Sequence, residues 1–484
     1  MIGMGAMVSE TAATMGRRRN GDQKSLMPIV YHPRGQEPDA ILPSNTQNLK
    51  GSPVKIMIAV CSMQYRSGAE LFVRDLALAL HRRGHSIVVY APLMGDVADE
   101  LRTRCIACIA DVACTSETPD LIIGNTRDDT VACLANFLST PAISICHDRT
   151  ASHGKPPRFT RIRQHVAVDE NCAERLFLEN GIPRSAIEIV SNGVDLERFR
   201  PRAPLPAQPL RAAIFSNYST ESDDTAAIRS ACEEFGISLE VIGKGVDRQE
   251  ASPEKVLAQF DLVFAKARCA MEAMAVGCAV ILLNEGTGMA GMVTPDNVQE
   301  WHRWNFGRRL MHRRIHRDAI VREIRSYCAP HAQAVSAYVR THVSLDATAT
   351  AMELLAQKIV DAEATRLPVA PENEIREFAR HVADNLMPFG ATQVAVQTGI
   401  LLAKIESLEA MLRRQQLQPS PPPAAPSPSP AALFPIPDQE LLERELSAAV
   451  TLISDLERQV GALRTSWSWR VTAPLRWLGT RRST

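Results

Sequence analysis

The stretch VKIMIAVCSMQYRSGAELFVRDLALALHRRGHSIVVYA, residues 54–91, contains two apolar runs separated by a helical pattern. The first run, residues 54–60, is apolar except for Lys55, which is typical of a strand buried on both faces of a parallel sheet. The middle part places its apolar residues on one helical stripe, and Gly84 stands where a helix C-cap belongs. The second run, residues 86–91, is another buried strand. This βαβ unit predicts a right-handed crossover in a parallel sheet.

The same alternation returns in a second half of the chain. Short apolar strands at 121–124 and 142–146 extend the first half, and the proline-rich run RPRAPLPAQP, residues 200–209, ends it. Strands are then expected at 211–216, 238–243, 261–265 and 279–284, with helices at 226–235 and 267–276. The fold class predicted is therefore α/β, with two Rossmann-like domains facing across a cleft and a helical C-terminal extension.

Composition divides the chain into six regions. We expect a disordered segment at 1–50, a first Rossmann-like domain at 51–203, a second one with a helical end at 204–365, a helical segment at 366–417, a proline-rich linker at 418–437, and a coiled coil with a basic tail at 438–484. The first fifty residues lack the apolar core of a signal peptide. No run of about 18 apolar residues occurs, so no membrane span is predicted.

The charge balance and the cysteine pattern argue against nucleic-acid-binding, metal-binding and disulfide-stabilised proteins. The 54 basic and 54 acidic residues balance, which argues against nucleic acid as the main partner. Cys105, Cys108 and Cys114 come closest to a metal pattern, but no second pair stands at zinc-site spacing, so no metal site is predicted. Eleven thiols without a disulfide frame fit a reducing compartment. The predicted location is the cytoplasm, peripheral to the inner face of the membrane.

From about residue 298 the sequence is basic and is predicted to be helical. His312 and His316 would then lie one turn apart, a spacing that metals use. Among so many arginines a solvated helix face is the better interpretation.

The last quarter has a different character. Leu401, Ile405, Leu408 and Leu412 form a short heptad-like seam, and apolar residues from Leu442 to Leu463 form a second seam of about three heptads. A parallel coiled coil there would make the chain at least a dimer. The end, residues 466–482, mixes tryptophan with arginine and contains no acid; a membrane-interface segment and a packing segment both fit this composition.

One loop at a strand end has the composition of an anion site. In RSGAE, residues 66–70, Gly68 allows close approach of a ligand to the backbone where a helix begins. The loop lacks the G-x-G-x-x-G pattern of dinucleotide-binding enzymes, which disfavours a nicotinamide enzyme.

Three motifs in order resemble glycosyltransferase family 4, whose members have the GT-B fold. Residues 67–70 are similar to the family's GGAE loop, and 272–275 with Gly277 are similar to its EAMA.G helix start. The NGVD…F.P signature is matched by Asn192, Gly193, Val194, Asp195, Phe199 and Pro201. The resemblance covers roughly residues 54–293.

The resemblance implies transfer of a sugar from a nucleotide diphosphate donor, such as a UDP- or GDP-sugar. The second domain would hold the donor and the first would admit the acceptor. Glu272 would accept hydrogen bonds from the donor ribose, and His147 would approach the donor sugar, with Asp148 beside it a weaker candidate. The basic loop Arg149, Lys155, Arg158, Arg161 and Arg163 is either an attractive surface for an anionic or lipid-linked acceptor or a solvated loop.

The chain departs from the family at two places. Phe264 stands where the first glutamate of the usual Glu-x7-Glu pair belongs, and residues 215–224 lack the usual Arg and Lys that neutralise the diphosphate. Our hypothesis is that Lys266 and Arg268 supply those charges, assisted by Gly286 and Gly288. Lys244 is a second candidate.

The resulting prediction is a bacterial-type glycosyltransferase that requires no cofactor or metal and acts on a glycan or lipid-linked acceptor. The tail is similar to an "SW.W..TAPLR" run of surface-polysaccharide glycosyltransferases, which favours that pathway. The alternative is a catalytically degenerate GT-B module that binds partners and assembles them.

Overall fold

The computed structural model describes residues 52–386, apart from positions 218, 221, 247, 249 and 251. The first domain contains a seven-stranded sheet in which every neighbouring pair is parallel. Its strands, in spatial order, are β5 (Ala107–Ile109), β3 (Ser86–Tyr90), β1 (Lys55–Ala59), β6 (Leu121–Gly124), β7 (Ala142–Cys146), β8 (Ile162–Ala167) and β9 (Ile187–Ile189). Strands β2 (Ser62–Met63) and β4 (Leu93–Met94) form a separate small parallel pair.

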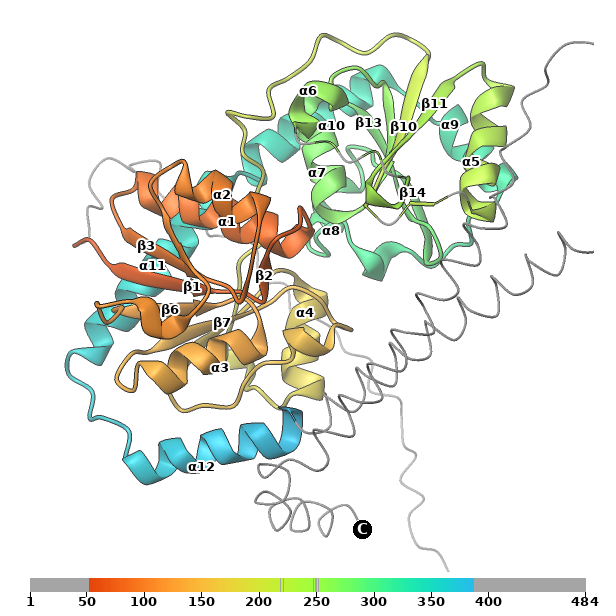
Figure 1. The fold of residues 1–484 in the computed structure, drawn as a ribbon. Coiled ribbons are helices and arrows are strands. Elements are labelled where there is room, and N and C mark those ends of the chain that lie inside the picture. The colour runs from red at the N-terminus through yellow and green to blue at the C-terminus, as the bar shows by residue number, and fades with distance from the viewer. Residues whose placement is uncertain are drawn as a thin grey trace, which may run out of the picture. The chain divides into compact units, whose positions relative to one another are not determined.

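Helices cover both faces of this sheet (Figure 1). Successive residues of β1 point to opposite faces, so Ile56 and Ile58 pack in one core and Met57 and Ala59 pack in another. The helices are α1 (Gly68–Arg82), α2 (Asp96–Arg102) and α4 (Glu170–Glu174) on the first face and α3 (Arg127–Asn136) on the second. The apolar runs read from the sequence are therefore buried on both sides, as predicted.

The second domain is built on a five-stranded sheet. Its spatial order is β11 (Ser238–Ile242), β10 (Arg211–Phe215), β12 (Leu262–Ala265), β13 (Ala279–Asn284) and β14 (Gly288–Met292), with β14 alone antiparallel. Its helices are α5 (Asp223–Glu234), α6 (Pro253–Leu257), α7 (Ala267–Val276), α8 (Val298–His302), α9 (Arg317–Arg325) and α10 (Ala329–His342). Two Rossmann-like domains are confirmed by these strand orders.

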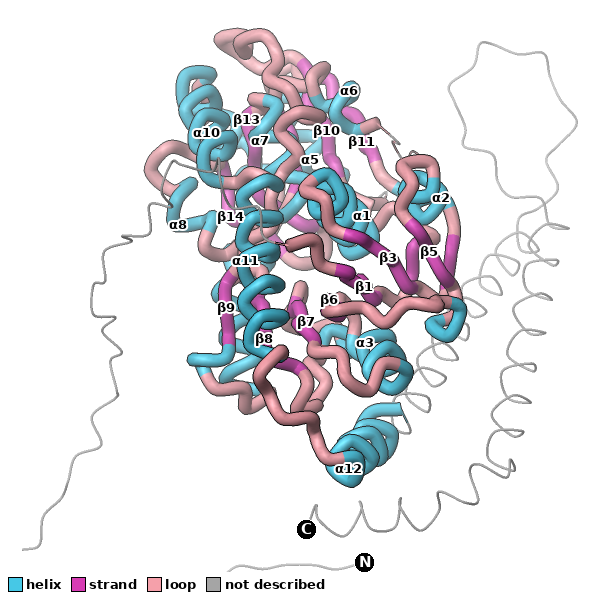
Figure 2. The backbone as a smooth tube through the Cα atoms, turned by 90° about the vertical axis from the view of Figure 1, so that its left-hand side faces the viewer, coloured by secondary structure: helices cyan, strands magenta, loops and turns pink. Residues whose placement is uncertain are grey.

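Helix α11 (Leu345–Glu363) belongs to the first core, which corrects the expected boundary of the second domain at residue 365. Met352, Ala356 and Ile359 are buried in the cluster that contains β1 and α1. Arg83 at the end of α1 pairs with Glu353 at 2.6 Å. The apolar stripe of α11 packs against α1. After the second domain, the chain therefore returns to the first domain (Figure 2).

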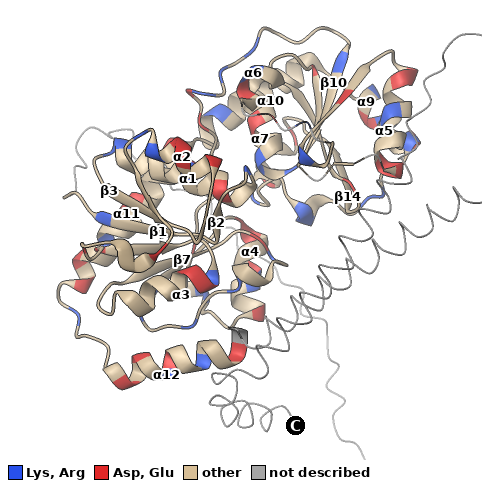
Figure 3. Ribbon diagram, viewed as in Figure 1, with Lys and Arg blue, Asp and Glu red and all other residues tan. Residues whose placement is uncertain are grey.

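Helix α12 (Pro371–His381) also packs on the first domain. Glu374 accepts hydrogen bonds from the buried Arg161, at 2.6 Å from its Nε, and Glu377 accepts one from the backbone of Thr160 at 3.0 Å. Figure 3 shows acidic residues, in red, along this helix. Ion pairs therefore attach α12 where its exposed Ile375 and Phe378 contribute little apolar burial.

The NGVD motif lies where two connecting segments meet. Val194 donates its backbone N–H to Val343 at 2.9 Å, and Leu345 donates to Val194 at 2.9 Å. A Cβ on Gly193 would collide with the backbone of Ser344, so only glycine allows this approach. Asp195 caps the following turn by accepting from the backbone of Arg198 at 3.1 Å. The motif thus fixes the crossing of the two segments.

The basic stretch after residue 298 is less helical than expected. Helix α8 ends at His302, and Asn305 and Phe306 adopt positive φ angles of 52° and 50°, which a continuous helix does not permit. His316 precedes α9 and accepts a hydrogen bond from the backbone of Ala319 at 3.3 Å. His312 and His316 are therefore not neighbours on one helix.

Several expectations fall outside the described residues: the disordered segment 1–50, the seam 401–412, the linker 418–437 and the coiled coil with its tail, 438–484. All eleven cysteines lie within the described part and are free. Among the described helices, none is both long and apolar enough to cross a membrane.

Candidate functional site

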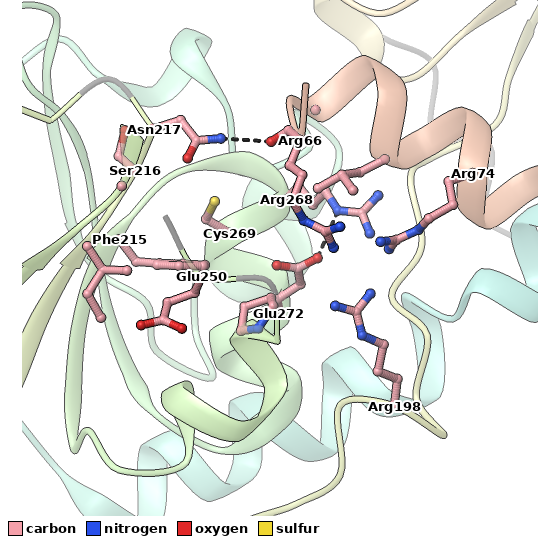
Figure 4. A pocket seen from close by; sticks show the side chains of 15 residues that line it. Arg66, Arg74, Arg198, Phe215, Ser216, Asn217, Glu250, Arg268, Cys269 and Glu272 are labelled. Atoms are coloured by element: carbon pink, nitrogen blue, oxygen red, sulfur yellow. Dashed lines mark hydrogen bonds and ion pairs between the residues drawn. The ribbon is translucent and has the colours of Figure 1, made fainter. Parts of the chain in front are cut away.

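A pocket of about 90 Å³ lies at the carboxyl ends of strands from the second sheet and the start of α1 (Figure 4). In each sheet the strand order reverses next to the strand that begins the domain, β1 or β10, and ligands of open α/β folds bind at such points. The lining residues are Arg66, Gly68, Leu71, Arg74, Arg198, Phe215, Ser216, Asn217, Ile242, Gly243, Glu250, Pro253, Arg268, Cys269 and Glu272.

Four arginines line one end of the pocket: Arg66, Arg74, Arg198 and Arg268. Each has an acidic partner. Arg74 donates to Glu100 at 3.1 Å, Arg66 pairs with the same carboxylate, and Arg198 donates to Glu254 at 2.9 Å. Arg74 also pairs with Asp75 at 2.6 Å, so Arg74 and Arg268 each bind two carboxylates. A guanidinium carries five N–H donors in a fixed fork, which suits it to bind carboxylates and other anions.

Arg268 connects α7 with α1. Its Nε donates to Glu272 one turn along α7 at 2.8 Å, and its Nη2 pairs with Asp75 of α1. Burial alone would disfavour ionisation of Asp75, but Arg268 and Arg74 outweigh it, so the pKa of Asp75 lies below its usual value. The three side chains form a carboxylate–guanidinium–carboxylate row across the pocket.

Glu272 is 4 % exposed and faces the pocket from the middle of α7. Burial raises the pKa of Glu272, with Arg268 acting in the opposite direction. Among the described residues, Arg268 donates a hydrogen bond to Oε1 of Glu272, and Oε2 remains as an acceptor. The carboxylate expected to bind the donor ribose therefore lies in the pocket, but part of it is occupied by Arg268.

Gly68, the first residue of α1, lines the pocket as expected. A Cβ built on it would meet no atom within 4 Å. The glycine is therefore not required by the packing of the protein itself, and the space beside it is open to a ligand.

Lys266, Gly286 and Gly288 lie outside the pocket lining. Lys266 precedes α7, and burial, followed by the charge of Arg308, lowers its pKa. Gly286 donates its backbone N–H to Asp224 at 2.8 Å, and Gly288 begins the antiparallel strand β14. Of the cations and glycines proposed for the diphosphate, the structure brings only Arg268 and Gly68 into the pocket.

Lys244, the second candidate, is exposed, and its Nζ lies 4.1 Å from the centroid of the Tyr65 ring. It does not line the pocket.

His147 follows β7 and is held by two neighbours. Its Nε2 lies 2.5 Å from Oδ1 of Asn125, which follows β6, and its ring meets Phe72 of α1 edge-on at 4.5 Å between centroids. Burial, followed by the nearby His153, lowers the pKa of His147 to about 4, so the imidazole is neutral at physiological pH. His147 is not among the pocket-lining residues.

Asp148, next to His147, stabilises the loop that contains it. Its Oδ1 accepts hydrogen bonds from the backbone of Thr150 at 2.5 Å and Ala151 at 2.8 Å. Those hydrogen bonds contribute to a lowered pKa for Asp148 against the opposing effect of burial.

Most arginines of the loop after His147 are engaged within the protein. Arg149 pairs with Glu174 at 2.7 Å, Arg163 with Glu363 at 2.6 Å, and Arg161 with Glu374 at 2.6 Å. Arg161 also donates to the carbonyl of Thr140 at 2.9 Å. These contacts favour the interpretation of the loop as a structural element rather than an anion-attracting surface.

Residues 66–198 match the family model described as Glycosyltransferase Family 4. The match contains α1, His147 and the NGVD motif, and it begins at the first pocket arginine. This match covers less than a third of the chain and lies within the first of the two Rossmann-like domains. It agrees with the family resemblance found in the sequence motifs.

Solved structures of similar outline include other glycosyltransferases. A glycosyltransferase from Rickettsia africae ESF-5 aligns with a TM-score of 0.47 and 12% identity over 64% of this chain and 99% of its own. Anabaena Alr3699/HepE, in complex with UDP and glucose, aligns with a TM-score of 0.46 and 15% identity over 65% and 100%. No curated protein matches this sequence significantly.

Three of the four pocket arginines were not predicted from the sequence. Arg66 and Arg74 flank the GGAE-like loop at the start of α1, and Arg198 follows the NGVD motif. A signal was present, because both motifs were recognised and each has an arginine within a few positions. Asp75 and Asn125 gave no comparable signal, since their partners Arg268 and His147 are distant in sequence.

Proposed function

We propose that this glycosyltransferase binds a nucleotide diphosphate sugar in the pocket beside Glu272 and transfers the sugar to a glycan or lipid-linked acceptor. The observation that carries the proposal is the convergence of four arginines and Glu272 at the carboxyl end of the second sheet. A diphosphate carries the opposite charge, and a ribose offers hydroxyl donors to a carboxylate.

The arginines replace the cations that are missing after β10. Residues 215–224 contain no basic residue, whereas Arg66, Arg74 and Arg198 reach the pocket from outside that strand. Fixed cations of this kind stabilise the charge that develops on a leaving nucleoside diphosphate. In this proposal they neutralise the leaving group without a metal cofactor, and transfer is expected to persist in a chelating buffer.

The pocket must widen to admit the donor. Its volume of about 90 Å³ is below the roughly 300–1,000 Å³ of ordinary ligand sites. Arg268 lies between Asp75 and Glu272 in the space that the donor would share. We expect the diphosphate to take over Arg268 from one of its carboxylates, which frees Glu272 for the ribose.

The first domain would receive the acceptor near His147. The neutral imidazole suits a hydrogen bond to a sugar hydroxyl better than binding of a second anion. The pathway proposed is assembly of a cell-surface polysaccharide at the cytoplasmic face of the membrane, a choice supported by the likeness of the tail sequence.

The test is calorimetric titration of the full chain with a panel of nucleotide sugars. Glu272→Gln keeps the size of the side chain and is expected to weaken binding of the preferred donor at least tenfold, because a charged acceptor is lost. Glu240→Gln, which changes a carboxylate of β11 outside the pocket, is the matched control and should bind as wild type does.

Unchanged binding in Glu272→Gln would contradict the assigned ribose contact. A folded protein that binds no member of the panel would instead favour the degenerate assembly module. The arrangement in which Arg268 already occupies Glu272 is the structural observation in favour of that second candidate.

A further inference from the structure

The pocket has two chemically different ends, and the second end contains a carboxylate without a close partner. Arginines gather at the α1 and α7 end. The other end, formed by the termini of β10 and β11, is lined by Phe215, Ile242 and Glu250. The start of α6 lies on the arginine side, because its Glu254 pairs with Arg198 at 2.9 Å. In Figure 4 the Glu250 carboxyl lies beside Phe215, away from the arginines.

This polarity matches that of a nucleoside diphosphate. Its charged diphosphate requires cations, while its base requires flat apolar contacts and a few polar groups that read its edge. The base therefore belongs at the end that contains Phe215 and Ile242. All residues of this end come from the second domain, so the assignment depends on one domain alone.

Glu250 is available to read the base. Its side chain is 29 % exposed, and among the described residues its Oε1 lies 4.0 Å from Nε of Arg248, beyond hydrogen-bond length. Arg248 itself binds Glu240 more closely, at 2.7 Å. The carboxylate oxygens of Glu250 thus retain their capacity to accept hydrogen bonds.

We propose that Glu250 selects guanine, so that the donor is a guanosine diphosphate sugar; this rests on the proposed function of the pocket. A carboxylate offers two acceptors and no donor. Guanine presents two adjacent donors, N1–H and the N2 amino group, along one edge. Uracil presents a single N3–H between two carbonyls, and adenine and cytosine place an acceptor next to their amino group, so each sets an acceptor against the carboxylate.

The experiment is calorimetric titration of the full chain with GDP, UDP, ADP and CDP, followed by the same series on Glu250→Gln. Wild type is expected to bind GDP roughly a hundredfold more tightly than the other three, because each mismatched base sets an acceptor against the carboxylate of Glu250. Glu250→Gln should lose most of this preference. Glu233→Gln, a carboxylate to carboxamide change at an exposed position of α5 outside the pocket, should keep it.

A gain of function makes the test independent of misfolding. Xanthine carries a carbonyl where guanine carries its amino group, so it pairs one donor and one acceptor with a carboxamide. Glu250→Gln should therefore bind xanthosine diphosphate at least tenfold more tightly than wild type does. A variant that binds this nucleotide is folded.

The outcomes separate the two proposals. Preferred binding of UDP, ADP or CDP overturns the assignment of guanine and leaves the sugar-nucleotide function intact. A GDP preference that persists in Glu250→Gln overturns the role of Glu250. Failure of every nucleoside diphosphate to bind overturns both the proposed function and the inference built on it.

Discussion

At the scale of single residues, the contact between Asn125 and His147 fixes which imidazole nitrogen carries the proton. Oδ1 of Asn125 is an acceptor, so the nitrogen 2.5 Å away, Nε2, is the protonated one and Nδ1 is left as an acceptor. Asn125 is 3 % exposed, and its amide nitrogen has no hydrogen-bond partner among the described residues. The pair is thus held in a buried setting at the ends of β6 and β7.

The first prediction is that Asn125→Ala disturbs this tautomer. Nitrogen-15 spectra of histidine-labelled wild type should show His147 neutral with its proton on Nε2, and the variant should show both tautomers. Sugar transfer should fall about tenfold, the effect of one lost hydrogen bond near 1.4 kcal/mol. Asn136→Ala, an exposed residue at the end of α3, is the control. An unchanged His147 spectrum in Asn125→Ala would disprove the assignment.

The second prediction concerns Asp75. Asp75→Asn removes one of the two carboxylates that hold Arg268, so the guanidinium should turn more readily to a diphosphate. Nucleoside diphosphate affinity is expected to rise roughly threefold to tenfold, while the free energy of unfolding falls by about 2 kcal/mol because the buried Arg74 and the partly buried Arg268 lose a counter-charge.

Titration calorimetry and urea unfolding measure the two effects. Asp99→Asn, an exposed acid on α2, is the control for the change of charge. Weaker rather than tighter binding in Asp75→Asn would mean that Asp75 presents Arg268 to the ligand.

At the scale of elements, Gly193 and Gly68, the glycines of two family motifs, differ in whether the packing of the protein requires a residue without a Cβ. Gly193 is forced by the backbone of Ser344, whereas Gly68 has open space around the position of its missing Cβ. The third prediction is that Gly193→Ala lowers the free energy of unfolding by about 3 kcal/mol, whereas Gly68→Ala leaves it nearly unchanged.

Urea midpoints of the two variants check this difference. Gly68→Ala should instead weaken donor binding, since the new methyl group would lie in the pocket. Equal stability of the two variants would show that the segments crossing at Gly193 can move apart at little cost.

Elements bounded by clear local signals were predicted well. Helix α7 and strand β13 occupy the expected residues, because a buried apolar stripe ends at Gly277, whose φ of 103° stops the helix. The segment around Asn305 and Phe306 was wrongly expected to be helical, since a positive φ at a non-glycine residue leaves little trace in sequence. The apolar stripe of α11 predicts a helix, but it does not indicate whether the helix packs in the core of the first domain or of the second.

At the scale of the whole molecule, buried neutral histidines make stability depend on pH. Burial lowers the pKa of His165 to about 4, and the same cause lowers the pKa of His147 and of His302 to about 4. Below their ordinary value of 6.5 these groups bind a proton in the unfolded chain but not in the folded one, so acid favours unfolding.

The fourth prediction follows from that difference. As the pH falls from about 6.5 to about 4, the free energy of unfolding should decrease by roughly 1.4 kcal/mol per pH unit for His165 alone. His165→Gln should make the dependence shallower in urea titrations over this range, and His312→Gln, at an exposed position, should not. An identical pH dependence in His165→Gln and wild type would show that His165 is protonated in the folded state.

The return of α11 to the first core also sets an order of events during synthesis. Strand β9 ends at Ile189, and the helix that completes its domain begins only at Leu345. At roughly 5–20 residues per second, the ribosome needs on the order of ten seconds to make the intervening chain. During that interval the face of α1 around Ala79, which Leu345 and Ala349 later cover, is open on the nascent protein. A chaperone that recognises apolar helices has access to the first domain for that time.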